Sequence, residues 1–516
     1  MHSAFATPVP LNNHNATRVN PLFSRHCERP IAARPSRRVP KVPVATSTST
    51  PPIAVAPLEA PAKLDRVVCK FGGSSLANAE RLKEVTKLVF GQVERSEKMP
   101  IVVLSAMGPT TNELLSAGDR ALKDGVVDTS SIRLRAYEAC DTLSLNKQDL
   151  VDPLLHNLDE LLVGIKFIKE LSPRTKDYLV SFGERLSVRI FAAHLRQNEG
   201  VPAEHVDAYN AGFVTDSNFT RAELLDETYT NVKKFFDKYI EDDHLAVVTG
   251  FIAKDEQGNI TTLGRGGSDL TASTIGASLN TSEVQVWKDV DGILSTDPRI
   301  VSEAVPIPSI SFEEAAEMAF FGAKVLHPIA MQPAMKYNVP VRVKNSYNPD
   351  HPGTVIVRRR DLDSSNPVTA ISLKRNVQIV DIVSTRMLGA SGFLSEVFKC
   401  FAFHGVSVDM IATSEVSISM TLDNTICESE TLLKLKEDLS EYAFVTLSER
   451  NKAIISLVSD SSRSTNVVGR AVCALDRAGV SVLMISQGAS KFNISVTIEA
   501  ADASAAVQAV HREFFP

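Results

Sequence analysis

The chain has 516 residues, of which 44% are hydrophobic and 22% charged, and its formal net charge is -6 at pH 7. This composition is typical of a globular protein with room for roughly three domains of about 150 residues each. The net charge excludes a general attraction to nucleic acid or to an acidic membrane surface, and no stretch approaches the roughly 18 consecutive apolar residues of a membrane span.

The six cysteines lie far apart, and no two of them form a CxxC pair. This spacing argues against a zinc site and against a disulfide framework. We therefore predict no protein-bound metal and expect a reducing compartment.

Residues 1–62 differ in composition from the rest of the chain. They contain six arginines and Lys41 but only two acidic residues, Glu28 and Glu59, and they are scattered with Ser, Thr and Pro. An Arg-rich, Ser-rich and acid-poor leader without an apolar core is typical of an organelle transit peptide. A plain disordered tail, which has the same composition, is the alternative.

Residues 63–360 alternate short apolar runs with amphipathic segments. Strands are predicted at residues 67–71, 101–104, 246–248 and 284–287, with a helix from about residue 78 and further helices to about residue 200. Short apolar strands separated by helices predict an α/β domain whose mainly parallel sheet is covered on both faces. Residues 361–376, which are polar and charged at first, are predicted to be a linker.

A Gly-Gly turn follows the first predicted strand, in the run Lys70-Phe71-Gly72-Gly73-Ser74-Ser75. The two glycines let the backbone approach a phosphate, the following helix offers free N–H groups, and Lys70 supplies a positive charge. Taken alone the motif is a weak signal, since most such turns bind nothing. The chain contains neither a Walker A loop nor a GxGxxG fingerprint.

A second glycine-rich loop, Gly264-Arg265-Gly266-Gly267-Ser268-Asp269, precedes a helix of small residues predicted at 271–277. An arginine in such a loop can bind a carboxylate with two hydrogen bonds while the helix start faces a phosphoryl group. A tight turn with an exposed arginine is the alternative.

Two basic segments come next along the chain, at residues 287–299 and 321–328. Taken singly, Lys288, Arg299 and Lys324 would be solvated surface charges. Their order along one α/β sheet favours an anion-binding site.

The last part of the chain contains an internal repeat, since Gly405–Ile411 returns as Gly479–Ile485. A helix precedes each copy, and a strand and another helix follow it. Two copies of β-α-β-β-α-β are therefore predicted at residues 377–448 and 449–516. They look like a pair of ACT domains, α+β modules that bind amino acids at their mutual interfaces. Two ferredoxin-like domains without a ligand are the alternative.

Together these features resemble the amino acid kinase superfamily, and specifically the aspartate kinases. The resemblance covers essentially all of residues 67–516 and includes, in order, Lys70–Ser75, Ser105–Met107 with Thr111-Asn112, Ser181–Glu184, Gly264–Asp269, Trp287–Arg299 and Phe321–Pro328. KFGGSS and LGRGGSD in one chain are a highly specific combination. Sister kinases that act on glutamate, carbamate or UMP share the fold but are not expected to carry this set.

The resemblance implies that ATP with Mg²⁺ phosphorylates the side-chain carboxylate of L-aspartate, the first step towards lysine, threonine and methionine. Lys70, with Gly72 and Gly73, would stabilise the transferring phosphoryl group, and Asp269 would order the loop and Lys70. The remaining nucleotide contacts would be Phe71, Ser105, Lys288, Asp289, Arg299 and Lys324. No general base is needed, because a carboxylate nucleophile is already ionised near pH 7.

The same resemblance assigns the substrate contacts. Arg265 would bind the α-carboxylate of aspartate and Glu184 its ammonium group. The groups that would assist in placing the substrate are Ser74, Thr111, Gly266, Gly267 and Ser268.

The ACT pair implies feedback by lysine, bound across the interface of a homodimer. The matching positions are Met387, Gly392, Phe393, Leu394, Ser407, Val408, Asp409, Thr413, Ser414 and Glu415. Asp409 and Glu415 can receive ammonium groups, while hydroxyls and backbone N–H groups can receive a carboxylate. Ala390 stands where some lysine-sensitive members have a hydroxyl, and S-adenosylmethionine acts beside lysine in some plant-type enzymes, so the effector stays open. The plant-type class also favours a plastid leader over a mitochondrial one.

Two other functions remain to be separated from this prediction. The first is an amino acid kinase of another specificity, which the context of Arg265 and Glu184 disfavours. The second is a catalytically inactive amino-acid sensor, which would have little reason to keep Lys70, Arg265 and Lys324 together. Turnover of ATP with aspartate separates all three.

Overall fold

The computed structural model describes residues 64–96, 99–241, 244–323, 326–360, 366–384, 392–423, 429–449, 451–459, 464–488 and 490–516. These residues belong to one unit of the chain, Pro61–Pro516. The predicted leader lies outside the described residues, as do Lys324, Met387 and Ala390. Within the described ranges, no helix is both long and apolar enough to cross a membrane.

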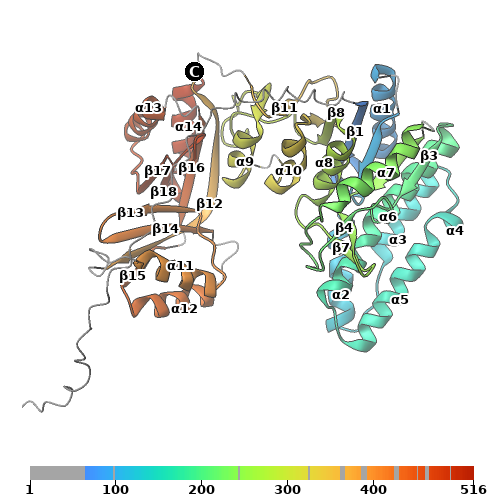
Figure 1. The fold of residues 1–516 in the computed structure, drawn as a ribbon, viewed down its shortest axis with the longest axis horizontal. Coiled ribbons are helices and arrows are strands. Elements are labelled where there is room, and N and C mark those ends of the chain that lie inside the picture. The colour runs from blue at the N-terminus through green and yellow to red at the C-terminus, as the bar shows by residue number, and fades with distance from the viewer. Residues whose placement is uncertain are drawn as a thin grey trace, which may run out of the picture. The chain divides into compact units, whose positions relative to one another are not determined.

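The first domain is built on an eight-stranded sheet with the strand order β3-β5-β2-β1-β8-β10-β11-β9 (Figure 1). Every pair of neighbouring strands is parallel except β10 with β11, which confirms the predicted mainly parallel sheet. The strands are β1 (Leu64–Phe71), β2 (Ile101–Leu104), β3 (Ala203–Val206), β5 (Leu245–Thr249), β8 (Thr281–Lys288), β9 (Ser309–Ser311), β10 (Val341–Asn345) and β11 (Thr354–Val357). A small sheet joins β4 (Val214–Thr215), β6 (Ile252–Asp255) and β7 (Ile260–Thr262).

Helices cover both faces of the large sheet. Val102 and Leu104 of β2 pack into the core on one face, and the alternate residues Ile101 and Val103 pack into the core on the other. Because both faces are covered, the central strands are continuous apolar runs rather than alternating ones. The first core draws on α1 (Ala79–Ser96), α2 (Thr110–Lys123), α3 (Ser130–Thr142), α5 (Asp152–Ile168) and α6 (Pro173–Asn198), with the short α4 (Lys147–Leu150) beside α5. The second draws on α7 (Glu227–Glu241), α8 (Gly267–Leu279), α9 (Phe312–Phe320) and α10 (Pro328–Tyr337).

The repeats form one sheet with the order β13-β14-β12-β16-β18-β17, in which β15 also pairs with β12. Each repeat keeps its own hydrophobic core, and Figure 1 shows α11 and α12 beside one half of the sheet and α13 and α14 beside the other. The strands are β12 (Val368–Val383), β13 (Met410–Thr413), β14 (Ser417–Asp423), β15 (Phe444–Leu447), β16 (Lys452–Ser459), β17 (Met484–Gln487) and β18 (Asn493–Glu499). The helices are α11 (Phe393–Phe403), α12 (Ser429–Ser440), α13 (Ser464–Arg477) and α14 (Ala503–Phe514).

The strand β12 corrects the predicted boundary between the domains. The segment 361–376 was expected to be a linker, but the chain is a strand from Val368 onward. The first part of β12 pairs with β16, and the last part pairs with β14 and β15. The second repeat therefore ends with α14. Its fourth strand is the first part of β12, which precedes the first repeat in the chain. The sequence hid this strand because residues 368–372 are buried almost throughout, which removes the polar-apolar alternation.

Helix α9 ties the first domain to β12. Arg360 pairs with Glu314 of α9 at 2.6 Å, and the hydroxyl of Thr369 on β12 donates to the same carboxylate at 2.8 Å. Burial opposes ionisation of Glu314, but the Arg360 guanidinium and these hydrogen bonds hold the pKa of that carboxyl below its ordinary value. The contact is therefore a satisfied buried ion pair that fixes α9 against the first part of β12.

Candidate active site

A polar cavity of about 290 Å³ opens where β1, β2 and β5 end. The carboxyl ends of parallel strands are the usual place for a ligand in an α/β sheet. The predicted residues that line the cavity are Lys70, Gly73, Ser105, Thr111, Glu184, Gly266, Gly267, Ser268 and Asp269. The structure thus brings together side chains from four regions of the chain that the sequence analysis had joined only by resemblance.

Lys70 and Asp269 form an ion pair in the cavity wall, with 2.6 Å between Nζ and Oδ1. Lys70 lies in β1, and Asp269 lies in the first turn of α8, where the helix dipole favours a negative charge. Burial opposes ionisation of Asp269, but Lys70 and Lys288 outweigh it and keep the pKa of the carboxyl below its ordinary value. Asp269 therefore stays an anion that holds Lys70 in place.

Lys288, the last residue of β8, adds a second ammonium group to this pair. Burial and the charge of Lys70 lower the pKa of Lys288, while Asp269 opposes the change. Asp289 also favours the charged form of Lys288, so Lys70 and Lys288 bring two ammonium groups to this region, near two carboxylates. Ammonium groups of this kind can attract a bound anion.

Glu184 of α6 faces the same cavity and is only 3% exposed. Its Oε1 accepts a hydrogen bond from the Ala106 N–H at 3.3 Å, whereas its Oε2 is buried without a partner among the described residues. Burial raises the pKa of Glu184 to about 8, against the opposing effects of backbone hydrogen bonds and of Lys70. A buried carboxylate oxygen without a partner indicates that a ligand supplies the missing donor.

The glycines of the two loops allow close approach of backbone segments. A Cβ at Gly73 would lie 3.0 Å from the Ala106 carbonyl oxygen. At Gly266, where φ is +75°, a Cβ would lie 2.6 Å from the His327 Cβ. Larger residues at either position would push the loops away from the cavity.

Several predicted residues lie outside the cavity lining. Phe71 is buried in the core, where its ring stacks on Trp287 at 5.8 Å between centroids, so only its backbone can reach a ligand. Ser74 is exposed, and its carbonyl accepts from the Tyr347 hydroxyl. Arg299 is exposed and pairs with Asp297 at 2.6 Å.

Three further predicted residues, like Lys288, are not among those that line the cavity. Arg265 is exposed, although Gly264 and Gly266 on either side of it line the cavity. Asp289 is exposed next to Lys288. Gly72 donates its N–H to the Trp287 carbonyl at 3.4 Å, and a Cβ there would lie 3.7 Å from the Lys70 Nζ.

The sequence analysis assigned no role to Gly108 and Phe251, which also line the cavity. Phe251 has a left-handed backbone, with φ +69°, and its N–H donates to the Thr271 hydroxyl at 3.2 Å. Their positions in the sequence could have indicated this, because Gly108 follows β2 and Phe251 follows β5, and these strands end at the same sheet edge as β1 with Lys70.

The described residues predicted to bind an effector lie around the start of α11 and at both ends of β13, and most of them are exposed. Ser414 bonds to the hydroxyl of Ser417, and Glu415 is exposed. Asp409 differs, because its carboxylate is held by Lys374 at 2.7 Å. Burial raises the pKa of Asp409, and Lys374 opposes this effect.

One group of potential metal ligands occurs in the described part of the chain, formed by Cys400, His404 and Asp438. His404 and Asp438 already bond to each other at 2.7 Å, and burial raises the pKa of the Cys400 thiol, which disfavours the thiolate that a metal needs. The hydrogen bond between His404 and Asp438 accounts for the close approach of these two side chains.

Comparisons with known proteins show which families the chain resembles. The amino acid kinase family matches residues 65–345, and an ACT domain matches residues 380–429 and 455–514. The chain is 50% identical over 460 residues to Aspartokinase 1, chloroplastic, of Arabidopsis thaliana. The aligned region covers 87% of this chain and 80% of that protein.

Two solved structures of E. coli aspartokinase III are similar to the whole of the described fold. The complex with aspartate and ADP, called the R-state, has a TM-score of 0.73 at 33% identity and covers 87% of this chain. The complex with lysine and aspartate, called the T-state, has a TM-score of 0.71 at 32% identity and covers 88% of this chain. Each match spans 100% of the solved chain.

Proposed function

Because the chain belongs to the aspartokinases of the amino acid kinase family, we propose that the cavity around Lys70 is where ATP phosphorylates the side-chain carboxylate of L-aspartate. The product is 4-phospho-L-aspartate. The observation that carries this assignment is the Lys70 ammonium, held in the cavity by Asp269, beside the unpaired oxygen of Glu184.

Phosphoryl transfer between two anions depends on positioning and on charge stabilisation. Lys70 neutralises charge on the transferring phosphoryl group, and Asp269 holds its ammonium in place. The first turn of α8, which begins at Gly267 and lines the cavity, adds the positive end of the helix dipole to the same space. The aspartate carboxylate is itself the nucleophile, so no side chain has to remove a proton.

Other groups of the cavity recognise aspartate. The ammonium group of aspartate donates to the buried Oε2 of Glu184, which has no partner of its own. Arg265 binds the α-carboxylate by turning inward between its flanking glycines, while Thr111 and Ser268 place the substrate. This arrangement favours a substrate with one ammonium and two carboxylate groups.

The nucleotide binds through Lys288 and the turn at Gly72 and Gly73, with Lys324 and Arg299 as further contacts. Among the described residues that line the cavity, the carboxylates are Glu184 and Asp269, and Asp269 is committed to Lys70. This donor set fits a Mg²⁺ that arrives on the phosphates of ATP rather than one held in a protein cage. When bound, Mg²⁺ neutralises phosphate charge.

The test is turnover of ATP by the purified enzyme with L-aspartate, with L-glutamate and with no acceptor. Release of ADP that depends on L-aspartate is expected, with little release on L-glutamate. Equal rates with both acids would indicate another specificity, and no turnover with either would indicate an inactive sensor.

We further propose lysine as a feedback effector of the ACT repeats, with S-adenosylmethionine as a second effector, and a homodimer formed through these repeats. The lysine complex of the E. coli relative supports the first point. Equal activity with and without millimolar lysine would contradict it, and light scattering at increasing protein concentration tests the dimer.

A plastid location is proposed from the composition of residues 1–62 and from the chloroplastic relatives. The measurement is the destination of a fluorescent protein fused behind residues 1–62. Fluorescence that stays in the cytosol would contradict the proposal.

A further inference from the structure

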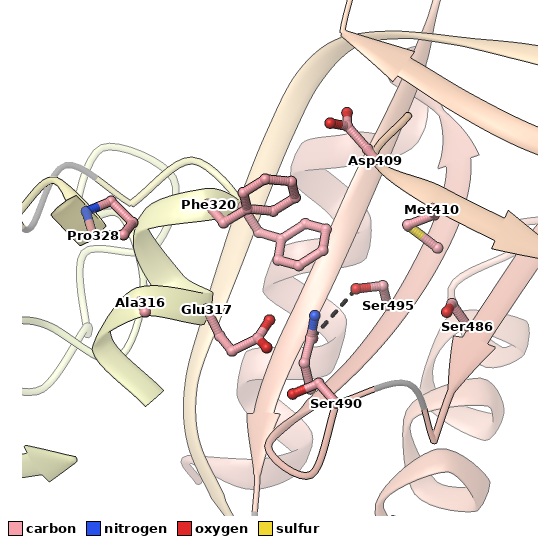
Figure 2. A pocket seen from close by; sticks show the side chains of 11 residues that line it. Ala316, Glu317, Phe320, Pro328, Asp409, Met410, Ser486, Ser490 and Ser495 are labelled. Carbon is pink, nitrogen blue, oxygen red and sulfur yellow. Dashed lines mark hydrogen bonds between the residues drawn. The ribbon is translucent and has the colours of Figure 1, made fainter. Parts of the chain in front are cut away.

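A cavity of about 430 Å³ lies beside α9 and the sheet of the ACT repeats (Figure 2). Asp409, one of the predicted effector residues, lines it, and Figure 2 shows Glu317 extending from α9 toward Ser490. Among the described residues, this cavity shares no lining residue with the active-site cavity. It therefore borders the regulatory repeats and adds nothing to the binding of aspartate.

The contacts that join the two segments assigned to aspartate converge instead on Asp177, which the sequence analysis did not single out. Asp177 lies in α6, and its side chain is only 1% exposed. Glu184 follows in the same helix after about two turns, so the two carboxyl groups lie on one face of α6. Asp177 is thus rigidly connected to the group assigned to the ammonium of aspartate.

The carboxylate of Asp177 accepts three hydrogen bonds from two other segments. Its Oδ2 accepts from the backbone N–H of Thr220 at 2.9 Å and from that of Thr262 at 3.0 Å, and its Oδ1 accepts from the Thr262 hydroxyl at 2.8 Å. Burial raises the pKa of Asp177, and these hydrogen bonds oppose the change. Because buried polar groups need their partners, this one carboxylate fixes both segments against α6.

The first of these segments leads into the glycine-rich loop. Thr262 is the last residue of β7, and Arg265 follows three residues later. The carbonyl of Thr262 accepts from the Ala222 N–H at 2.9 Å, so the backbone N–H, carbonyl and hydroxyl of this residue are all bonded. The start of the loop that carries Arg265 is therefore fixed, and Asp177 is its link to α6.

The second segment packs against the same loop. Thr220 has a left-handed backbone, with φ +74°, and a Cβ at Gly264 would lie 3.4 Å from its carbonyl oxygen. Gly264 also has a positive φ, of +67°, and it lines the active-site cavity. A residue other than glycine keeps such a strained conformation only where its surroundings fix it. The hydrogen bond to Asp177 supplies this support to Thr220.

We propose that Asp177 is a positioning residue for aspartate: its carboxylate holds Glu184 and the Arg265 loop at the spacing at which one amino acid meets both. This role rests on the proposed function and on the parts that Glu184 and Arg265 play in it. Asp177 does not line the cavity, so it acts through these two residues. Two binding groups held at a fixed spacing bind one substrate without first having to be ordered.

The experiment is steady-state kinetics of the full chain with aspartate and ATP each varied. Asp177→Ala should raise the KM for aspartate about tenfold and leave the KM for ATP unchanged, because the change misplaces only the amino-acid groups. Thr262→Val removes the hydroxyl donor alone and keeps the backbone bond, so the KM for aspartate should rise about threefold. This milder variant keeps the proposal testable if Asp177→Ala does not fold.

Asp159→Ala is the matched control. The carboxylate of Asp159, on α5, likewise accepts from a threonine hydroxyl, that of Thr129 at 2.7 Å, and from Arg133 of α3 at 2.6 Å. It therefore also ties a helix to other segments, but none of these residues lines the active-site cavity. Asp159→Ala should lower the resistance to urea and leave the KM for aspartate unchanged.

A double-mutant cycle separates positioning from a general loss of structure. In an Arg265→Ala background, Asp177→Ala should change the KM for aspartate less than about twofold, because the loop no longer carries the group that Asp177 places. A purely structural effect would instead raise the KM by the same factor in both backgrounds, and that result would overturn the proposal.

Two further results are decisive. An unchanged KM for aspartate in both Asp177→Ala and Thr262→Val would overturn the positioning role and leave the kinase assignment intact. A wild-type enzyme without turnover that depends on L-aspartate would overturn the proposed function and this inference together.

Discussion

Two buried carboxyl groups in the active site differ in protonation because their neighbours differ. Asp269 touches Lys70 and feels Lys288, so its pKa lies below the ordinary value despite burial. Glu184 is also buried, but the group it contacts on another segment is the neutral backbone N–H of Ala106. Burial therefore raises the pKa of Glu184 to about 8. The first carboxyl is a fixed anion, and the second becomes an anion when a cation arrives.

The protonation of Glu184 predicts a pH dependence of aspartate binding. The ammonium group of aspartate needs the ionised carboxylate, so kcat/KM for aspartate should rise with pH up to about 8. Glu184→Gln should raise the KM for aspartate and remove this rise. The measurement is a pH profile at saturating ATP, and a profile in Glu184→Gln with the same rise would contradict the role.

The same raised pKa has a consequence for stability. Between the ordinary value of 4.5 and about 8, folded Glu184 keeps a proton that the unfolded chain has lost. Its contribution to stability is therefore fully present below pH 4.5 and is lost as the pH rises through about 8. Urea unfolding at several pH values should show this decline weakened in Glu184→Gln.

Lys70 has a catalytic and a structural effect that a double variant can separate. Lys70→Met should lower kcat at least ~100-fold, as expected for the loss of a charge that stabilises the transition state. It should also destabilise the fold, by at most about 3–5 kcal/mol, because Asp269 loses its partner. Lys70→Met combined with Asp269→Asn should regain stability but stay inactive. Activity in the double variant would show that Lys70 serves only the fold.

At the scale of elements, helix α6 is positioned by close contact with the loop after β2. A Cβ at Gly183 would lie 2.8 Å from the Ala106 Cβ, and Ser187 donates to the Ser105 carbonyl at 2.8 Å. Glu184 lies between these contacts and bonds to Ala106. The ammonium-binding group is thus placed by the packing of its helix.

Gly183→Ala tests this placement. In a helix, Ala for Gly normally stabilises by about 0.5–1 kcal/mol. At Gly183 the added methyl should instead push α6 from the loop, destabilise by about 1–3 kcal/mol and raise the KM for aspartate. Gly164→Ala in α5 is the matched control, since its Cβ would meet nothing within 4 Å. Equal behaviour of the two variants would contradict the packing argument.

At the scale of the whole molecule, β12 belongs to both ACT repeats. It pairs with β16 before a register shift between Lys374 and Val377, where Asn376 has φ +61°, and it pairs with β14 and β15 after that shift. The repeats therefore share one continuous strand, and α9 is hydrogen-bonded to its first part.

A comparison of two fragments tests the shared strand. Residues 366–516 should give a soluble ACT pair, because β16 keeps its neighbour. Residues 377–516 should aggregate or unfold at lower urea, because the edge of β16 loses its partner. Size-exclusion chromatography and urea unfolding measure the difference. Two fragments of equal solubility and stability would contradict the role of residues 368–374.

The sequence by itself determined the fold class, the two glycine loops and their order along a parallel sheet. These features are local, because glycine spacing and apolar periodicity leave their pattern in neighbouring residues. The two loops could thus be found, but it was the resemblance to a known family that joined Lys70 and Gly73 to Gly267 and Asp269. All four line one cavity at the ends of the parallel strands.

Only the tertiary structure decided how these groups are charged and where several of them point. The raised pKa of Glu184 and the burial of Phe71 against Trp287 depend on segments that meet in space. The strand at residues 368–374 and the ion pair between Lys374 and Asp409 are of the same kind, because their partners lie 35 or more residues away. Burial and charge at a point are properties of everything packed around it, and no local pattern in the chain encodes them.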